Sequence, residues 1–520
     1  MLPFSVDESS PPQQIISGSS LAVSLPRPPR RFYRHGWHSW SLAAWTDLSP
    51  LPIQKPYILH PMQVDPVHAK EIRPHGSWVG AVEFDDGAIL LLGSLGLGAH
   101  VTLNGNQLEG SYEAGSGDWL IAQGDEAAVF SEYAAELGKR FGLKSNKPAP
   151  RVWCTWYSLY SAIDELLLHT AIEGLGDLPF DVLQVDDGWQ TSVGDWQANP
   201  RFPSGMAPLA EEIKSTGRKA GLWLAPLIAV KSSKLFREHP DWFLHDERGR
   251  LVSAGHNWGE YLYALDATHP AVREWLAALM KQVRSWGFDY LKLDFLYGGA
   301  LPGRRRQEML REAAYRSVLK DLREAMGPDA YFLACGAPIV PSIGVCDALR
   351  VGPDVAGTWE EHREAVLLHN PTTPGVRNAI RTTIHRLWLS RLVQADPDVA
   401  YFASAGNSLA NEQKQLLQNL ALVCNFKATS DLPQWLNPQE RNDLLHFLQD
   451  PQRIERISPR VFRINGRIVD FEPAMSLPAP AAGPDRLAGA ITGWLGDQSW
   501  ALALNHRLQK NALQKTKRGP

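Results

Sequence analysis

Two segments of this chain indicate its fold most clearly: Leu291-Lys292-Leu293-Asp294-Phe295 and Arg350-Val351-Gly352-Pro353-Asp354. Each segment places an aspartate at the C-terminal end of an expected β-strand. In (β/α)8 barrel enzymes the active site is assembled at that end of the strands. Two carboxyl groups that face one another are also the minimum set of catalytic groups for hydrolysis of a glycosidic bond. The two segments therefore predict a barrel enzyme that hydrolyses sugars.

After Pro150 the chain alternates apolar, strand-like runs with helical segments. One expected helix covers residues 271–286, with Gly287 as its stop, and another covers 307–326. This alternation indicates a parallel sheet, and eight units over about 300 residues favour a closed barrel over an open, doubly wound sheet. Strands are expected at 152–157, 182–186, 220–225, 290–294, 331–335, 348–351, 392–395 and 422–426.

Other regions flank the expected barrel. Residues 20–140 alternate short apolar runs with turns, including a hairpin turn expected at Asn104-Gly105, and a polar, proline-bearing linker follows at 144–150. Strand-like runs return at 461–464 and 500–504. We therefore expect an N-terminal β-sandwich domain at residues 1–147, a catalytic (β/α)8 TIM barrel at 148–450, and a small C-terminal β-domain with a mobile tail at 451–520.

Composition and charge argue against several classes of protein. The chain has 520 residues, 44% of them hydrophobic and 21% charged, which suits a large folded core. A formal net charge of -4 provides no basic field for nucleic acid. The N-terminal residues lack the order of a secretory signal, and no apolar run is long enough to span a bilayer. Four cysteines without metal-type spacing suit a reducing compartment. We therefore expect a cytoplasmic protein without a membrane or nucleic-acid partner.

Tryptophan is frequent, with 19 residues in the chain. The apolar C–H faces of a pyranose pack against indole rings, whereas the sugar hydroxyls need charged or amide partners at the edge of the ring. Most of these tryptophans are expected to fill protein cores. Those beside polar motifs are candidates for lining a sugar site.

Lys292 and Asp294 are two positions apart, so on a strand both side chains point to the same side and Leu293 points to the other. A neighbouring lysine keeps an aspartate ionised, which a nucleophilic carboxylate requires at neutral pH. Lys292 is also able to donate to substrate hydroxyls. The alternative is a buried ion pair with a purely structural purpose.

Asp354 is expected to work in the opposite protonation state. A general acid keeps its proton until the leaving oxygen accepts it, so its pKa has to be raised, and an ionised Asp294 nearby would raise it. Arg350 lies four residues earlier and offers a bidentate fork to a ring hydroxyl or to Asp354 itself. The alternative is a plain junction between a strand and a loop.

Two other strand ends carry polar motifs, Val185-Asp186-Asp187-Gly188-Trp189 and Gly221-Leu222-Trp223-Leu224-Ala225-Pro226. Adjacent carboxylates cannot both lie in an apolar core, so at least one must meet solvent, a cation or hydroxyl donors. Sugar hydroxyls are suitable donors. A metal is disfavoured because neither an HExxH motif nor a calcium-type loop is nearby, and Gly96-x-Gly98 is no dinucleotide fingerprint. We therefore expect no metal and no cofactor.

Seven short motifs follow one another along the chain: His35-Gly36-Trp37-His38-Ser39-Trp40-Ser41, Thr155-Trp156-Tyr157-Ser158, Asp186-Asp187-Gly188-Trp189, Gly221-Leu222-Trp223-Leu224-Ala225-Pro226, Leu291-Lys292-Leu293-Asp294, Ala334-Cys335-Gly336-Ala337-Pro338 and Leu349-Arg350-Val351-Gly352-Pro353-Asp354. Each motif alone is weakly specific, but the seven in this order are specific. Over most of residues 30–450 the chain resembles glycoside hydrolase family 36, the α-galactosidases or melibiases. The resemblance implies a retaining, exo-acting enzyme that works without a cofactor.

The resemblance also implies a role for each matching residue. Asp294 would be the nucleophile and Asp354 the acid/base, in agreement with the assignment from the residues alone. The implied substrate-binding residues are Asp186 and Asp187 for the axial 4-hydroxyl and the 6-hydroxyl of galactose, Lys292 for its 3- and 4-hydroxyls, Arg350 for its 2-hydroxyl, Trp156 and Trp223 for the pocket walls, Cys335 close to the ring, and Trp40, with Trp37 in reserve, as the N-terminal tryptophan that closes the site.

The chain departs from the family pattern at Ala395-Asp396-Pro397-Asp398, where alanine replaces the usual asparagine, and its flanking domains look short. These departures leave the acceptor preference and assembly into a homo-oligomer open. The expected activity is hydrolysis of terminal α-linked galactose from oligosaccharides such as melibiose and raffinose. The alternatives are a galactosyl transferase of the raffinose-synthase type, an α-N-acetylgalactosaminidase and, more remotely, a non-catalytic carbohydrate-binding protein. Both carboxylates are retained, which disfavours the last.

Overall fold

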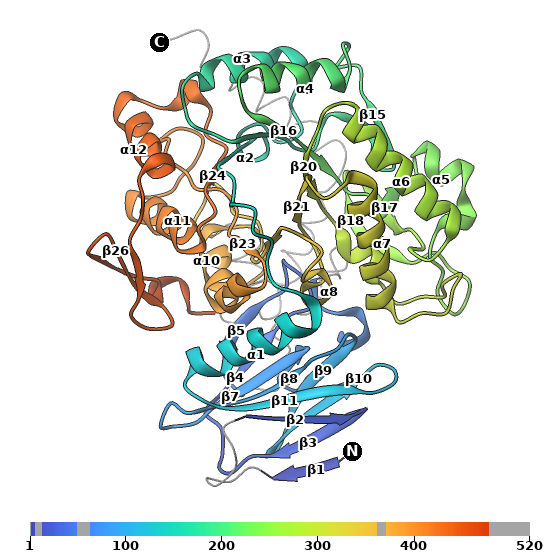
Figure 1. The fold of residues 1–520 in the computed structure, drawn as a ribbon, viewed down its shortest axis with the longest axis vertical. Coiled ribbons are helices and arrows are strands. Elements are labelled where there is room, and N and C mark those ends of the chain that lie inside the picture. Colours follow the sequence, from blue (N-terminus) through green and yellow to red (C-terminus); the bar gives the residue numbers. More distant parts are fainter. Residues whose placement is uncertain (1, 6–12, 49–62, 361–370, 478–520) are drawn as a thin grey trace, which may run out of the picture.

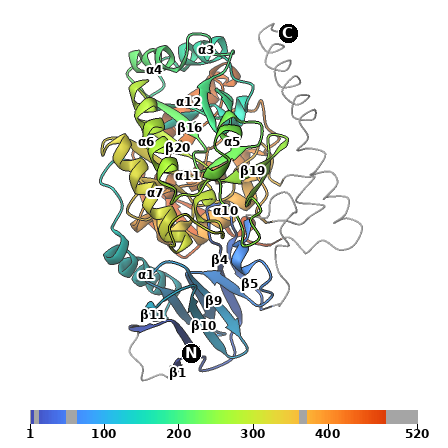
Figure 2. The same ribbon diagram turned by 90° about the vertical axis from the view of Figure 1, so that its right-hand side faces the viewer.

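The computed structural model describes residues 2–5, 13–48, 63–360 and 371–477. Figure 1 shows a pair of β-sheets at the bottom, a larger unit of strands and helices above them, and a small sheet at the lower left of that unit. In the side view of Figure 2, helix α1 (Glu126–Phe141) lies where the lower and upper parts meet.

Two mostly antiparallel sheets form the N-terminal part and pack on one another through apolar side chains. The turn between β9 and β10 consists of Gly105 and Asn106, one residue later than expected, because Asn104 pairs with Gln107. Gly105 supplies the positive φ, 57°, that this turn requires. The first sheet contains, in spatial order, β1 (Leu2–Ser5), β3 (Ser20–Ser24), β10 (Gln107–Tyr112), β9 (Ala99–Asn104) and β6 (His75–Ser77). The second contains β2 (Gln13–Gly18), β11 (Gly117–Gly124), β8 (Ile89–Ser94), β7 (Val79–Glu83), β4 (Arg31–His35) and β5 (Ala43–Thr46).

Helix α1 packs on the second sheet and begins at a well-defined cap. The Asp125 side chain accepts a hydrogen bond from the backbone N–H of Ala128 at 2.8 Å, which satisfies one of the free donors at the start of the helix. The ring of Tyr133 lies directly over Gly93 of β8, where a Cβ atom would meet it at 2.5 Å. This close approach explains why the strand has glycine at that position.

The central sheet has eight strands, and every pair in it is parallel. The strands follow the order of the chain around the sheet, and the last strand returns beside the first. Between β23 and β24 the backbone N–H of Ala400 donates to the carbonyl of Ala428 at 2.8 Å. The sheet therefore curls in the manner of a TIM barrel. Its strands are β12 (Val152–Cys154), β13 (Val182–Val185), β16 (Lys219–Leu224), β20 (Tyr290–Leu293), β21 (Tyr331–Ala334), β22 (Ala348–Arg350), β23 (Gln394–Asp396) and β24 (Ala428–Thr429).

Six of the eight expected strands match a strand of this sheet, with ends that differ by up to three residues. The strand expected at 392–395 is displaced to Gln394–Asp396. The strand expected at 422–426 is wrong, because Leu422 to Cys424 end helix α11 and the eighth strand comes later. The buried residues of α11, among them Leu417, Ala421 and Cys424, have helical spacing. The two-residue strand β24 is too short to produce a pattern of its own.

Helices cover the outside of the central sheet in Figure 1. Helix α6 shows how the sequence sets their ends, because Pro270 occupies its first turn, His269 caps the N–H of Ala271, and Gly287 follows the last turn with a φ of 101°. The helices are α2 (Trp156–Leu159), α3 (Glu165–Leu175), α4 (Met206–Ser215), α5 (Lys234–Glu238), α6 (Pro270–Ser285), α7 (Arg311–Met326), α8 (Ile339–Ser342), α10 (Val376–His385), α11 (Asn411–Cys424) and α12 (Pro438–Gln449). Short 3-10 turns are η2 (Pro66–His68), η3 (Pro240–Trp242), η4 (Leu296–Ala300), η5 (Leu387–Arg391), η6 (Pro433–Trp435) and η7 (Glu472–Ala474).

Small antiparallel sheets complete the structure. β14 (Gln190–Ser192) and β15 (Asp195–Ala198) form one hairpin, and β17 (Ile228–Val230), β19 (Glu260–Ala264) and β18 (Ser253–Asn257) form a three-stranded sheet. After α12 come β25 (Ile454–Arg456), β26 (Val461–Ile464) and β27 (Arg467–Asp470), so the strand expected at 461–464 is confirmed. The strand expected at 500–504 and the expected tail lie outside the described residues. Among those described, no helix combines the length and the apolarity that a membrane span requires.

Arg386 joins the N-terminal part to the central sheet. Its fully buried guanidinium donates to the carbonyl oxygens of Gly36 and His38 at 3.0 Å, of Ser39 at 2.6 Å and of Val351 at 3.1 Å. Burial lowers the pKa of Arg386 to about 10, so it stays charged at neutral pH. A single buried cation thus satisfies four backbone acceptors that belong to two parts of the chain.

We predict that Arg386→Met lowers the free energy of unfolding by about 3 kcal/mol, because a buried acceptor that loses its donor costs about 1 to 3 kcal/mol. Thermal unfolding followed by circular dichroism measures the effect as a lower melting temperature. Arg391→Met, at an exposed position five residues further on, is the matched control and should melt like the wild type. A melting temperature of the Arg386 variant equal to that of the wild type would contradict the idea that the hydrogen bonds from Arg386 to the four carbonyl oxygens stabilise the fold.

Candidate active site

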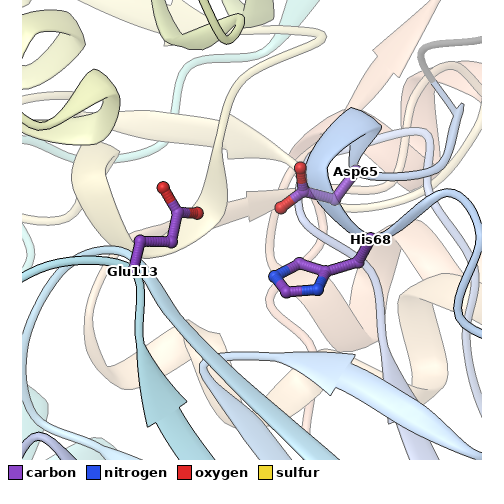
Figure 3. A group of neighbouring side chains, drawn as sticks. All are labelled: Asp65, His68 and Glu113. Atoms are coloured by element: carbon purple, nitrogen blue, oxygen red, sulfur yellow. The ribbon is translucent and has the colours of Figure 1, made fainter.

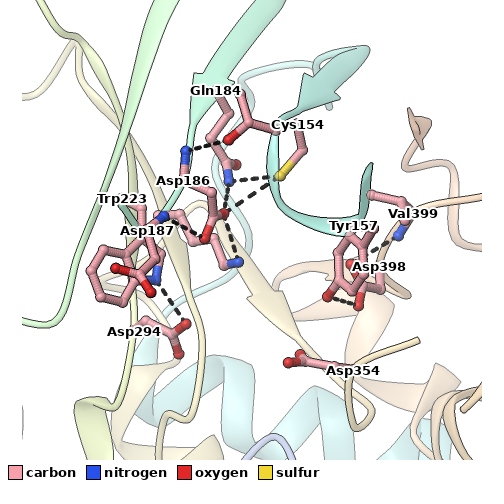
Figure 4. A network of polar contacts seen from close by, with 12 residues as sticks. Cys154, Tyr157, Gln184, Asp186, Asp187, Trp223, Asp294, Asp354, Asp398 and Val399 are labelled. Carbon is pink, nitrogen blue, oxygen red and sulfur yellow. Dashed lines mark hydrogen bonds and ion pairs between the residues drawn. The ribbon is translucent and has the colours of Figure 1, made fainter. Parts of the chain in front are cut away.

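Polar side chains gather at the C-terminal ends of the central strands, where the sequence places its motifs. Most of them lie within one network of hydrogen bonds and ion pairs, part of which Figure 4 shows. The site residues at these strand ends are Asp186 and Asp187 after β13, Trp223 in β16, Lys292 in β20 and Asp294 directly after it, Cys335 after β21, and Arg350 at the end of β22 with Asp354 four residues later.

Asp294 is held by a donor on each carboxylate oxygen. The indole N–H of Trp223 donates to Oδ2 at 2.9 Å, and the backbone N–H of Phe295 donates to Oδ1 at 2.8 Å. Phe295 has a left-handed backbone, with a φ of 51°, which turns the chain immediately after the strand. These two donors fix the orientation of the Asp294 side chain.

Lys292 and Asp186 form a buried ion pair with 2.9 Å between Nζ and Oδ2. Burial opposes the charge of the lysine, but the carboxylates of Asp186 and Asp294 outweigh it and hold the pKa of Lys292 well above its usual value. Gln184 also donates to Asp186 Oδ2, at 2.6 Å, and the backbone N–H of Asp187 donates to Oδ1 at 3.0 Å. Asp186 is therefore tied to its surroundings through both oxygens.

Asp187 has a separate set of partners. Gln190 donates to its Oδ1 at 2.5 Å, and the indole N–H of Trp258 donates to Oδ2 at 2.7 Å. Burial raises the pKa of Asp187, while these two hydrogen bonds lower it in part. One strand end thus presents two neighbouring carboxyl groups in two different environments.

Arg350 is shared among three carboxyl groups. Its Nε donates to Asp396 Oδ2, and its Nη1 lies 2.8 Å from Oδ1 of Asp354 and 2.8 Å from Oδ2 of Asp398. Although burial opposes the charge, Asp396 and Asp398 hold the pKa of Arg350 well above its usual value. The hydroxyl of Tyr157 donates to Asp398, which also accepts from the backbone N–H of Val355 at 2.9 Å.

Asp354 faces Asp294 across the network in Figure 4. Burial raises the pKa of Asp354, the charges of Arg350 and Lys292 lower it, and those of Asp294 and Asp186 raise it again, with a raised pKa as the outcome. The Asp354 side chain is 31% exposed, whereas the whole of Asp294 is 6% exposed. The arrangement pairs Asp294, which is buried and fixed, with the more accessible Asp354, whose pKa is raised.

Comparison with known proteins identifies the family. The Melibiase family model matches residues 142–323. The α-galactosidase TtGalA from Thermus thermophilus, solved with p-nitrophenyl α-D-galactopyranoside, is 46% identical, with a TM-score of 0.84, and the match covers 90% of this chain and 96% of that one. The chain belongs to glycoside hydrolase family 36, the melibiases. The fold alone is shared with the family member AgaA from Geobacillus stearothermophilus, at 14% identity and a TM-score of 0.55, over 82% of this chain and 61% of that chain.

Curated relatives in the family match over a shorter range. Alpha-galactosidase 2 from Pediococcus pentosaceus is 32% identical over 175 residues, which are 32% of this chain and 23% of the relative. The match to the curated relatives thus spans about a quarter of their length.

The three tryptophans expected on the N-terminal side and at the first strand differ in their burial. Trp40 packs edge-to-face on Phe295 with 5.1 Å between ring centroids and is partly exposed. Trp37 is fully buried and stacks with Arg311, so it cannot close an open site. Trp156 is partly buried at the start of α2.

Sequence reasoning missed several residues of this network, among them Tyr157, Trp258, Asp396 and Asp398. Tyr157 lay within a quoted motif, and Asp396 and Asp398 within the departing Ala-Asp-Pro-Asp stretch, so a signal existed for these three. Trp258 stands between Asn257 and Gly259, which indicates a turn and nothing more. Its contact with Asp187 joins residues 71 positions apart and follows from the fold alone.

One other group of side chains has ligands suited to a metal. Asp65, His68 and Glu113 bring their ligand atoms within 4.8 Å of one another (Figure 3). Arg311 donates to Asp65 at 2.7 Å and to Glu113, so its guanidinium already supplies the positive charge. This arrangement favours an ion-pair cluster between β10, η2 and α7 over a metal centre.

We predict that Asp398→Asn flattens the pH dependence of stability between about pH 4 and pH 7. Burial raises the pKa of Asp398 to about 7, Arg350 lowers it and Asp354 raises it. Across this window the folded protein keeps a proton that the unfolded chain has released, so its stability falls as the pH rises through it. Denaturant unfolding at several pH values measures the slope. Asp85→Asn, on an exposed turn, should keep the wild-type slope, and an unchanged slope in the Asp398 variant would contradict the assignment.

Proposed function

We propose that this chain is a retaining, exo-acting α-galactosidase that removes terminal α-linked galactose from oligosaccharides such as melibiose and raffinose. The observation that carries the proposal is the pair Asp294 and Asp354, two carboxyl groups at one site, of which the first is fixed by Trp223 and the second has a raised pKa. Membership of family 36 supports it, as does TtGalA, which is 47% identical over 84% of this chain and has been solved in complex with stachyose.

In the proposed first step, Asp294 attacks the anomeric carbon and Asp354 gives its proton to the departing oxygen. Trp223 and Phe295 hold the attacking carboxylate in one orientation, which reduces the entropy that the reaction must lose. The bond from the anomeric carbon to the leaving oxygen breaks as the bond to Asp294 forms, so the product is a β-galactosyl ester and a free acceptor hydroxyl.

In the second step, Asp354 takes a proton from water, and the water oxygen displaces Asp294 to give α-galactose. The change of role has an electrostatic cause. Asp294 loses its negative charge when it forms the ester, and this charge is one of the influences that raise the pKa of Asp354. The pKa of Asp354 therefore falls in the intermediate, and the group becomes a base when a base is needed.

The proposed binding roles follow the family pattern residue by residue. The charged Lys292 and Arg350 donate to ring hydroxyls, and both are already oriented by buried carboxylates. Asp186 and Asp187 accept from the axial 4-hydroxyl and the 6-hydroxyl. The remaining proposed lining consists of Trp156, Trp223, Cys335 and Trp40.

The proposal also includes the wider organisation of the chain. The central sheet is proposed to act as a closed (β/α)8 barrel at residues 148–450, with the β-sandwich at 1–147 supplying Trp40 and a C-terminal β-domain at 451–520. Action in the cytoplasm, without a cofactor, remains a prediction from the sequence.

We predict that Asp294→Ala lowers kcat on p-nitrophenyl α-galactoside by at least about 10⁴-fold while its circular dichroism spectrum stays that of the wild type. Azide should restore part of the turnover and give β-galactosyl azide, because the anion fits the space left by the carboxylate. The α-glucoside and the β-galactoside serve as substrate controls for the wild type. Turnover close to wild type in the variant would reject Asp294 as nucleophile.

We predict that Asp354→Ala loses most activity on raffinose, whose leaving group needs a proton, and keeps more of it on the nitrophenyl substrate, whose leaving group does not. Azide should accelerate the second step and give α-galactosyl azide, the opposite anomer to that from the Asp294 variant. Product anomers are read by nuclear magnetic resonance. Equal losses on both substrates, with no azide product, would contradict the acid/base assignment.

A further inference from the structure

Trp258 lies at the tip of the hairpin formed by β18 and β19, in an unusual backbone conformation. Asn257 pairs with Glu260, so Trp258 and Gly259 are the two turn residues, with φ values of 54° and 78°. Two positive φ values define a tight hairpin turn that favours Asn or Gly, and a large aromatic residue is strained there. Strain of this kind is retained at ligand clamps when other contacts hold the residue in place.

The contact that holds Trp258 is its hydrogen bond to Asp187. The indole N–H donates to Oδ2 at 2.7 Å, and Gln190 donates to Oδ1 at 2.5 Å from the other side. Without the indole, one oxygen of this buried carboxyl group would lose its protein donor. Trp258 therefore determines the direction in which the Asp187 carboxylate points.

The Trp258 ring also contacts the two residues that orient Asp294. Its centroid lies 6.1 Å from that of Trp223 and 5.3 Å from that of Phe295, and Trp40 packs on Phe295 as well, at 5.1 Å. Aromatic side chains from the hairpin, the barrel and the N-terminal part thus form one continuous wall. The opposite side of the network is polar and contains Arg350 and Asp354.

The hairpin that carries Trp258 is anchored on both flanks. The hydroxyl of Tyr297 donates to the carbonyl of Ala254 at 2.7 Å, and Glu260 accepts from the hydroxyl of Ser232 at 2.5 Å and from its backbone N–H at 3.0 Å. The hairpin that contains the strained Trp258 is therefore held in place on both sides, and the fold sets the position of the Trp258 ring.

We propose that Trp258 is a specificity-determining residue that fixes Asp187 toward the 6-hydroxyl of the terminal galactose and covers the sugar beside Trp223. The inference rests on the proposed α-galactosidase activity. Asp186 Oδ2 already accepts from Lys292 and Gln184, whereas Asp187 has one side-chain donor on each oxygen and keeps a free lone pair on each for the exocyclic hydroxyl. The indole pre-orients that acceptor before the sugar arrives.

The test compares p-nitrophenyl α-galactoside with p-nitrophenyl α-D-fucoside, the analogue that lacks only the 6-hydroxyl. In Trp258→Phe a ring remains but the N–H is lost. We expect the kcat/KM for the galactoside divided by that for the fucoside to fall about tenfold relative to the wild type. An Asp187 carboxylate that is no longer held in one orientation discriminates less between the two substrates. Trp275→Phe, at a partly exposed tryptophan on α6, is the matched control and should keep the wild-type ratio.

A second variant keeps the test informative if the phenylalanine variant folds poorly. Trp258→Asn suits the left-handed backbone, so the relief of backbone strain offsets part of the stability that is lost with the hydrogen bond to Asp187. We expect it to lose the preference for the 6-hydroxyl and also to raise KM for both substrates. An unchanged ratio in both variants would overturn the inference. An inactive wild type would instead overturn the proposed α-galactosidase activity, so the two failures are distinguishable.

Discussion

The site depends on the balance of buried charge. Six carboxyl groups, those of Asp186, Asp187, Asp294, Asp354, Asp396 and Asp398, meet two cations, Lys292 and Arg350. Ionised groups away from water need partners, and two cations cannot neutralise six carboxylates. Burial raises the pKa values of Asp187, Asp354 and Asp398, and the charges of neighbouring carboxylates raise them further.

The distribution of donors distinguishes the two carboxyl groups that we propose as nucleophile and acid/base. Asp294 accepts from Trp223 and Phe295, and these neutral donors fix the orientation of its side chain. Asp354 shares Arg350 with Asp396 and Asp398, so the positive charge of Arg350 stabilises the ionised form of Asp354 less than it would in an isolated ion pair. Two chemically identical side chains thereby have different surroundings, as the complementary roles that we propose for them require.

The N-terminal part belongs to the site as well as to the fold. Arg386 ties the backbone of residues 36–39 to the carbonyl of Val351, three residues before Asp354. The backbone N–H of Ser39 also donates to the carbonyl of Ala337 at 3.1 Å. Trp40 is thereby held against Phe295, next to the proposed nucleophile. The position of the aromatic wall follows from how the N-terminal part docks on the barrel.

The sequence alone determined the strand ends that carry Asp186, Lys292, Asp294 and Arg350, because apolar runs that end in a polar motif are a local pattern. It also indicated helix ends such as Pro270 and Gly287, since capping is local too. The two-residue strand β24 had no such pattern, and 422–426 was read as a strand although it ends a helix. Only the tertiary structure decided that Asp398 shares Arg350 with Asp354, that Tyr157 donates to Asp398, and that Trp258 reaches Asp187. The physical reason is that these contacts join distant strand ends, where the energy of a buried charge depends on its neighbours in space and not on its neighbours in the chain.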